Sequence, residues 1–473
     1  MARNTFSGHL GFVLAAAGSA VGLGNIWRFP YLAAKNGGGL FLLVYMVLVF
    51  TFGFALLLTE VAIGRKTQHG PLSAYKKLHP NWGWLGLLAT IIPAIILPYY
   101  SLIGGWVVKY FTVFATGQVA DATQDGFFGG FITAQYSPIV FHTIFFGATA
   151  LIIYAGVNKG IERISKILMP LLLVLVLGIA IYSCTLSYTD ENGVTRTGMQ
   201  GLAIYLIPDF TGMTFGRFLG VVMDALGQLF YSLSVAMGIM VAYGSYLKKS
   251  DNLPKSVTRV QIFDTGVAVL AGMMIIPAVF AFMGTEGFGA GPGLMFVSLP
   301  KVFLAMGATT GTIIGILFFA TVFFAALTSC MSILEAIVAS LIDEFKWTRK
   351  KATIVGSIYG WALGVVVALG YNLFYFEYKL PNGSTAQILD IFDYVSNSIM
   401  MPVLAFLTCL LVGWVLKPDT IIEEAEQGAG RFTRQALYVV LIRFVCPVLL
   451  ALVFLKAIGF FDYLKTLWVF PVA

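Results

Sequence analysis

The sequence is poor in charged residues and in the residues that enzymes use for chemistry. Charged side chains make up only 11% of its 473 residues, whereas soluble domains carry about a quarter. Its four cysteines fall within or beside apolar stretches without the spacing of metal ligands, and its four histidines are scattered. We therefore expect neither a disulfide framework nor a zinc site. The sequence shows no recognisable pairing of a nucleophile with a base, so we do not expect an enzyme.

Long apolar stretches fill most of the chain, and 59% of its residues are hydrophobic. A helix needs about 20 apolar residues to cross a bilayer, and roughly eleven such stretches can be placed. A backbone in lipid must satisfy its own hydrogen bonds, and the alternating pattern of a membrane β-barrel is absent, so these stretches are expected to be helices. The sequence thus predicts an all-α polytopic membrane protein with spans at residues 10–36, 40–64, 84–113, 138–156, 162–185, 217–246, 260–283, 303–342, 351–373, 389–415 and 435–458.

The net charge of +7 comes from Lys and Arg in the short loops between apolar stretches. Membrane topology explains this placement better than a nucleic-acid partner, which we do not expect. With a cytoplasmic N-terminus, most of these residues lie in inner loops and about seven in outer loops, as the positive-inside rule requires. We expect a multi-pass protein of the cell (inner) membrane whose C-terminus is extracellular or periplasmic.

Two spans carry residues that interrupt a helix at mid-membrane depth. The first has three glycines between Gly18 and Gly24, and the sixth has small and hydroxyl residues from Ser232 to Gly238. Close helix packing through small residues would explain either stretch alone. Five spans apart, the two breaks favour a 5+5 inverted repeat with broken helices 1 and 6, plus an eleventh helix. The expected parts are a cytoplasmic N-terminal latch at 1–9, a first five-helix repeat at 10–185, an extracellular loop at 186–216, a second repeat at 217–415, and at 416–473 a cytoplasmic loop, helix 11 and a short extracellular tail.

The run from Gly18 to Pro30, followed by Asn36 to Gly39, resembles the first-helix signature of the neurotransmitter:sodium symporters. Further matches at Gly227-Gln228, at Ala325 to Ser329 and at Asp393 spread the resemblance over residues 7–415. The resemblance implies a prokaryotic Na⁺-coupled secondary symporter that imports a neutral amino acid by alternating access. It implies two Na⁺ ions, an amino-acid substrate and surrounding membrane lipid, and we expect no obligate protein partner.

Carried over by position, the resemblance implies two sodium sites rich in carbonyl and hydroxyl oxygens. The first would use the Ala20 carbonyl, Asn25, Ser232 and Asp264, and the substrate carboxylate would complete it. The second would use the Gly18, Val21 and Ala325 carbonyls with the hydroxyls of Thr328 and Ser329. Hydroxyls in an apolar helix also commonly bond back to the preceding turn, which is the alternative for Thr328 and Ser329.

The resemblance also implies a substrate site at the break of the first helix. Tyr100 would bind the substrate carboxylate together with backbone amides of the broken helix, although a tyrosine there could equally be a packing aromatic. Glycine at position 22, where amine carriers of the family have an acid, favours a zwitterionic amino acid. Ala236 and Met237 stand where the bacterial leucine transporter of this family has a Gly-Phe pair. This difference favours a substrate with a hydrophobic or aromatic side chain. The implied substrate residues are Ser19, Gly22, Leu23, Gly24, Ile96, Tyr100, Phe230, Tyr231, Ser232, Ser234, Met237, Ser329 and Ile333.

A guanidinium within a membrane span must find a partner, and Arg28 is such a residue. The resemblance pairs it with Asp393 and adds Gln228 and Tyr231 as an extracellular gate, with a purely structural ion pair as the alternative. On the cytoplasmic side it implies a latch around Arg3 and Ser7, where Phe6 replaces a tryptophan of some relatives. Glu60 would support the unwound first helix.

Two further features bear on the transport cycle. Gly160 and Pro170 enclose nine residues of the fifth span that could unwind at modest cost, although a helix start and a simple kink are the alternative. Chloride-dependent animal members carry asparagine at the position of Asp264 and serine at that of Ala268. The chain is therefore expected to need no chloride, with Asp264 as the permanent countercharge; a structural acid bonded to Ser232 or Asn25 is the alternative.

Other classes of membrane protein fit less well. Proton- or polyamine-linked transporters of the broader superfamily lack the combination of Asn25 with Thr328 and Ser329. An ion channel would want rings of charge or a carbonyl filter, and neither pattern is present. A substrate-sensing receptor would usually carry a soluble output domain, and only about fifteen residues follow the eleventh span.

Overall fold

The computed structural model describes residues 5–190, 192–288, 293–428, 430–461 and 463. The chain divides into two compact units, and each takes segments from both halves of the sequence. Unit 1 comprises Met1–Phe50, Tyr100–Leu233 and Ser256–Ser332, and unit 2 comprises Thr51–Tyr99, Ser234–Lys255 and Ile333–Ala473. The division of the chain into two five-helix repeats stays a prediction.

The all-α membrane fold is confirmed. Among the described residues, nine helices are long and apolar enough to cross a membrane. A tenth span is formed by His9–Ala20 and Gly24–Lys35, which meet at an angle of 56°. The remaining predicted span, the sixth, corresponds to two helices separated by a break, Phe215–Leu233 and Ile239–Gly244.

Two predicted span boundaries differ from the structure for identifiable reasons. The eighth span begins at Ala308 rather than at residue 303, because Gly307 has a φ of 97° and separates it from the short preceding helix. The seventh begins at Leu253 rather than at 260, since its first turns carry Lys255 and Arg259 and so lacked the apolar signal of a span. The predicted extracellular loop 186–216 contains an antiparallel strand pair and a helix.

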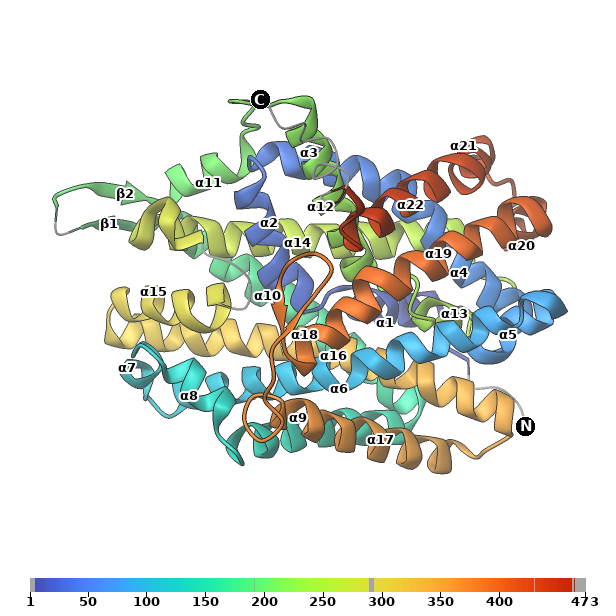
Figure 1. The fold of residues 1–473 in the computed structure, drawn as a ribbon, viewed down its shortest axis with the longest axis horizontal. Coiled ribbons are helices and arrows are strands. Elements are labelled where there is room, and N and C mark those ends of the chain that lie inside the picture. The colour runs from blue at the N-terminus through green and yellow to red at the C-terminus, as the bar shows by residue number, and fades with distance from the viewer. Residues whose placement is uncertain (1–4, 191, 289–292, 429, 462, 464–473) are drawn as a thin grey trace, which may run out of the picture. The chain divides into compact units, whose positions relative to one another are not determined.

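In unit 1, α1 packs against α10, and α12 packs against α3 and the turn η1 (Figure 1). The elements of this unit are α1 (His9–Ala20), η1 (Gly24–Arg28), α2 (Phe29–Lys35), α3 (Gly39–Leu48), α7 (Val119–Ala122), α8 (Phe127–Thr133), α9 (Ser137–Ala155), η4 (Val157–Glu162), α10 (Arg163–Cys184), β1 (Ser187–Thr189), β2 (Thr195–Thr197), α11 (Gly198–Leu206), α12 (Phe215–Leu233), η5 (Gly284–Phe288), η6 (Leu294–Ser298) and α15 (Leu299–Ala305).

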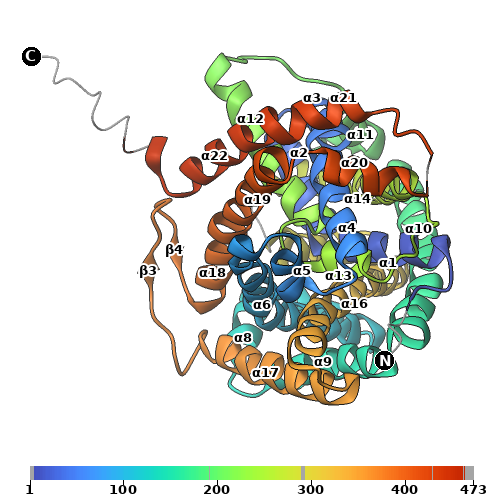
Figure 2. The ribbon, with the colours of Figure 1, turned by 90° about the vertical axis from the view of Figure 1, so that its right-hand side faces the viewer.

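In unit 2, α13 packs against α4 and α5, and α19 packs against α22 (Figures 1 and 2). The strands β3 and β4 pair in a loop that Figure 2 shows clearly. The elements are α4 (Phe54–Thr67), α5 (Pro71–Leu78), η3 (Pro80–Trp82), α13 (Ile239–Gly244), α17 (Arg349–Leu369), β3 (Tyr378–Lys379), β4 (Thr385–Ala386), α18 (Ile388–Asp393), η7 (Tyr394–Met400), α19 (Met401–Leu410), η8 (Leu411–Val415), α20 (Asp419–Glu426), α21 (Gln435–Val440), η9 (Leu441–Val445) and α22 (Cys446–Ala457).

Four helical segments belong partly to each unit: η2 (Val49–Gly53), α6 (Trp84–Ala115), α14 (Leu253–Met283) and α16 (Ala308–Phe345).

Both helix breaks that the sequence predicted are present. In the first span α1 ends at Ala20, Val21 adopts an extended conformation, and helical structure resumes at Gly24. In the sixth span Ser234, Ala236 and Gly238 all have positive φ angles, of 52°, 59° and 68°. Left-handed backbone at a residue with a Cβ costs roughly 1–2 kcal/mol, so this break must be held by its surroundings.

Candidate functional site

The break in the first helix faces two hydroxyl groups of unit 1. The Leu23 amide donates to the Tyr100 hydroxyl at 3.3 Å, and the Gly22 amide donates to Asn25 Oδ1 at 3.3 Å. A Cβ at Gly22 would lie 2.7 Å from Ser329 Oγ and 2.8 Å from the Tyr100 hydroxyl oxygen. Glycine is therefore required here by space, and the backbone, Tyr100 and Ser329 together line a small polar cradle.

A buried carboxylate lies beside the same break. Asp264 on α14 accepts hydrogen bonds from Asn25 Nδ2 at 2.7 Å and from Ser232 Oγ at 2.9 Å. All three side chains are fully buried. Among the described residues, Asp264 forms no ion pair, so its partners are neutral. A buried carboxylate without a cation is costly, and this arrangement favours binding of one.

A second group of oxygens surrounds Ser329 on α16. Its Oγ lies 3.0 Å from the Ser19 carbonyl oxygen, 3.2 Å from that of Val21 and 3.4 Å from that of Gly18. The structure thus brings the predicted Gly18, Val21 and Ser329 together. It also adds the Ser19 carbonyl, which the sequence had suggested only as part of the substrate site.

Thr328 makes the hydrogen bonds that the alternative describes, and its role as a sodium ligand stays a prediction. Its Oγ1 donates to the Phe324 carbonyl at 2.9 Å and to the Ala325 carbonyl at 3.1 Å, one turn earlier. A Cβ at Gly18 would lie 3.2 Å from the Thr328 Cβ, so the two residues are close neighbours. The same Cβ would lie 3.1 Å from Met169 Sδ, which places α10 directly against this part of α1.

The fifth-span segment between Gly160 and Pro170 combines a wide helical turn with an interior proline. Gly160 lies in the π-helical turn η4, where a Cβ would collide with the Ile152 carbonyl oxygen. Pro170 lies inside α10. Between them Ser165 is buried, and its hydroxyl has no hydrogen-bond partner in the part of the chain that is described. Unwinding of this segment stays a prediction, with a simple kink as its alternative.

Three of the four predicted gate residues meet in unit 1. Gln228 Nε2 donates to the Gly24 carbonyl at 3.0 Å, and the Arg28 guanidinium lies 5.3 Å from the centre of the Tyr231 ring. The fourth, Asp393, belongs to unit 2, where it accepts from Asn397 Nδ2 at 2.6 Å. Asn397 Nδ2 also donates to the Tyr99 hydroxyl at 2.9 Å. Asn397 was missed because a polar residue one turn after an acid gives no distinctive sequence signal.

The remaining predicted site residues divide between the units. Ala20, a predicted ligand of the first sodium ion, and Phe230, a predicted substrate residue, belong to unit 1 and are buried. Ile96, Ser234, Met237 and Ile333 belong to unit 2, so their role in a pocket with the unit 1 residues stays a prediction.

Glu60 contacts the helix break of the sixth span. Its Oε1 accepts a hydrogen bond from the Ala236 amide at 2.6 Å, within the break of the sixth span. Its expected support for the unwound first helix, which belongs to unit 1, stays a prediction. The Ala236 amide lies outside any regular helix, so this hydrogen bond gives it a partner and helps to hold a left-handed residue in place.

The N-terminal segment contacts the fifth span. The Ser7 amide donates to Glu162 Oε2 at 2.9 Å, the Ser7 hydroxyl also donates to this carboxylate, and Lys166 pairs with it at 2.6 Å. Phe6 is buried, with its ring 5.8 Å from that of Phe12. Arg3 lies outside the described residues. Glu162 was missed, since nothing local distinguishes it from a solvated loop acid.

The chain is similar to known sodium-dependent transporters over nearly its whole length. The model of the Sodium:neurotransmitter symporter family matches residues 3–124 and 140–473. The uncharacterized sodium-dependent transporter YhdH of Bacillus subtilis (strain 168) is 35% identical over 96% of the chain and 97% of its own length. The crystal structure of MhsT in complex with L-phenylalanine is 36% identical, with a TM-score of 0.83 over 96% of this chain and 100% of that one. The human sodium- and chloride-dependent GABA transporter 2 is 26% identical over 90% of the chain and 75% of its own length.

Proposed function

The chain belongs to the sodium:neurotransmitter symporter family, and from that premise we propose that it imports a neutral, hydrophobic or aromatic amino acid together with two Na⁺ ions, independently of chloride. It is a Na⁺-dependent transporter and not an enzyme. The orientation that the loop charges favour, with the N-terminus in the cytoplasm, is part of the proposal.

The observation that carries the proposal is the buried Asp264 carboxylate, which has only neutral partners among the described residues. A Na⁺ ion and a substrate ammonium in a site of low dielectric need more negative charge than the substrate carboxylate provides. Asp264 supplies it permanently. Ala268, one turn further along α14, is buried and offers no hydroxyl to an anion.

The substrate carboxylate fits the cradle at Gly22. Backbone amides at a helix break and a tyrosine hydroxyl are donors suited to a carboxylate. Hydrogen bonds to Asn25 and Ser232 hold the Asp264 carboxylate beside this break. Its negative charge suits the substrate ammonium and Na⁺. MhsT, which is similar over 96% of the chain, was crystallised with L-phenylalanine, and this supports an aromatic or large apolar substrate.

Release to the cytoplasm is proposed to begin in the fifth span. Met169 covers Gly18, so unwinding between Gly160 and Pro170 would uncover the oxygens around Ser329. Extracellular closure is proposed to involve Arg28, Tyr231, Gln228 and Asp393.

The direct test is uptake of radiolabelled amino acids into proteoliposomes. We expect uptake of phenylalanine or leucine with an inward Na⁺ gradient and none when K⁺ replaces Na⁺. Replacement of chloride by gluconate should leave the rate unchanged. Chloride-dependent uptake by the unmodified protein would overturn the assignment of Asp264, and uptake of phenethylamine equal to that of phenylalanine would overturn the zwitterionic substrate.

A further inference from the structure

A cavity of about 660 Å³ lies in unit 2 where the last loop meets the last membrane helix. It is lined by Arg431, Phe432, Thr433, Gln435, Ala436 and Val439. Its volume is within the range of small-molecule sites, about 300–1,000 Å³. None of the transport residues discussed above lies in it.

Three hydrogen-bond donors of this lining have no partner in the described part of the chain. They are the Arg431 guanidinium, the Thr433 hydroxyl and the Gln435 amide, and all three residues are exposed. A guanidinium with two neutral donors beside it is a group that recognises phosphate oxygens. Arg434 adds positive charge nearby, with its guanidinium 5.2 Å from the centre of the Phe54 ring.

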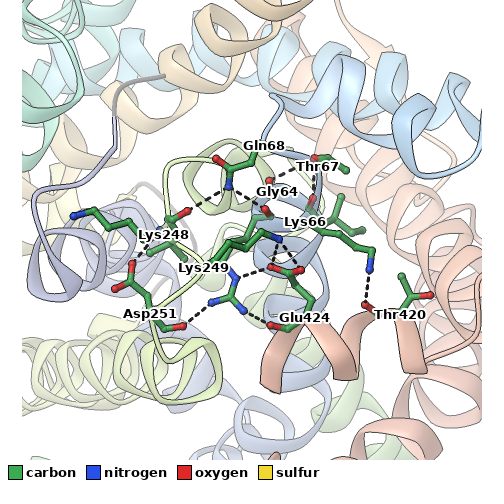
Figure 3. Close-up of polar contacts among 12 residues, drawn as sticks. Gly64, Lys66, Thr67, Gln68, Lys248, Lys249, Asp251, Thr420 and Glu424 are labelled. Carbon is green, nitrogen blue, oxygen red and sulfur yellow. Dashed lines mark hydrogen bonds and ion pairs between the residues drawn. The ribbon is translucent and has the colours of Figure 1, made fainter. Parts of the chain in front are cut away.

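The helix α20, which precedes the loop that carries these donors, is held by ionic contacts, and one hydrogen bond ties the loop to it. Glu424 on α20 accepts from Arg65 Nε at 2.8 Å and from Lys249 Nζ at 2.8 Å, and Arg65 also donates to the Asp251 carbonyl (Figure 3). Glu426 Oε1 accepts the Phe432 amide at 3.1 Å. These two acids are thus engaged, while the exposed Asp419 and Glu423 on the same helix are outside the cavity lining.

An apolar surface continues from the cavity along the membrane helix. Leu437, Val440, Phe444 and Val448 are exposed to between 43% and 60% and follow one another at helical spacing. Ala436 and Val439 in the cavity lining begin the same apolar surface. Polar donors at the end of a span, next to an apolar stripe, match an amphiphile better than a free phosphate ion.

We propose that this cavity binds the phosphate headgroup of an anionic phospholipid, with the acyl chains along the stripe from Leu437 to Val448. In the proposed orientation, the lipid belongs to the cytoplasmic leaflet, where anionic lipids attract basic residues at span ends. The headgroup accepts from Arg431, Thr433 and Gln435, and the wall is Phe432, whose buried ring lies 6.3 Å from that of Phe54.

The test is native mass spectrometry of the full-length protein in a non-ionic detergent. Phosphatidylglycerol and phosphatidylcholine with the same acyl chains are titrated separately, and we expect phosphatidylglycerol to bind at least about tenfold more tightly. Arg431→Gln removes the charge, and Ala436→Phe fills the cavity without changing the charge. Each should abolish most of the preference.

Matched controls separate this site from general effects. Lys417→Gln removes a charge from the turn before α20, and Ile358→Phe enlarges an exposed apolar residue on a different helix, α17. Both should keep the preference within about twofold. Thermal unfolding checks that each variant is folded. Equal binding of the two lipids, or equal losses in Arg431→Gln and Lys417→Gln, would overturn the proposal. Displacement of phosphatidylglycerol by inorganic phosphate would identify a free-phosphate site and overturn the lipid assignment.

Discussion

At the scale of single residues, Gly22 is defined by the space around it. A methyl group there would lie well inside contact distance of Ser329 Oγ and the Tyr100 hydroxyl. We expect Gly22→Ala to raise the KM for amino-acid uptake at least about tenfold, since overpacking typically costs 1–3 kcal/mol. Gly266→Ala is the control, because that glycine on α14 has open space beside it. Unchanged uptake by Gly22→Ala would show that the cradle does not hold the substrate.

Asp264 gives the second residue-scale prediction. Replacing it with asparagine keeps the shape and removes the charge that we assign to balancing Na⁺ and the substrate ammonium. We expect Asp264→Asn either to lose uptake by at least about tenfold or to regain it only with chloride. The measurement is uptake in chloride and in gluconate. Asp224→Asn is a suitable control, because Asp224 is an acid of the same unit whose Oδ2 forms an ion pair with Lys35 Nζ at 3.7 Å. Full activity of Asp264→Asn in gluconate would make the acid merely structural.

The residues of this site also show what sequence reasoning can reach. Asn25 and Asp264 are 239 positions apart, so only the resemblance to a family placed them together. Asp264 with Ser232 and Asn25 is the contact that the structural alternative described, and it is compatible with either role. The Ser7–Glu162 pair spans 155 positions and had no motif to signal it.

At the scale of elements, the breaks in the first and sixth spans could be read from local composition. Glycines and small polar residues weaken a helix wherever they lie, and no tertiary contact is needed to recognise them. The group that holds a break is a different matter. Glu60 was recognised as an intramembrane acid, but its partner is Ala236, 176 positions away, and that choice depends on packing. The eighth span began late because a single left-handed glycine ended the helix before it.

The fifth span provides a prediction at this scale. If unwinding between Gly160 and Pro170 opens the cytoplasmic path, Pro170→Ala should restore a helical hydrogen bond and disfavour opening. The readout is maleimide labelling of Met169→Cys, which is buried in the structure, in a background whose four native cysteines are replaced. We expect labelling and transport to slow severalfold. Pro138→Ala is the control, because that proline occupies the first turn of α9, where its amide would have no helical partner. Equal labelling with and without Pro170 would leave the simple kink as the explanation.

At the scale of the whole molecule, unit 1 holds the residues assigned to both sodium sites and the carboxylate cradle. Asp264 is bonded to Asn25, just after the first-helix break, and to Ser232, and the carbonyls around Ser329 belong to residues 18–21 at that break. Ligands at both sites would contact the same interrupted segment, so a ligand that favours its binding conformation should also favour binding of the other.

This sharing predicts reciprocal coupling between Na⁺ and the amino acid. Amino-acid affinity should fall when K⁺ replaces Na⁺, and the amino acid should raise Na⁺ affinity by the same factor, because linkage is symmetric. Each ligand should also raise the temperature of unfolding in detergent, since saturation at 100 times the Kd stabilises a protein by about 2.7 kcal/mol. The amine analogue without a carboxylate should leave Na⁺ affinity unchanged, because the substrate carboxylate is the proposed link to the first ion. Amino-acid affinity that is the same in Na⁺ and K⁺ would separate the two sites and refute the shared segment.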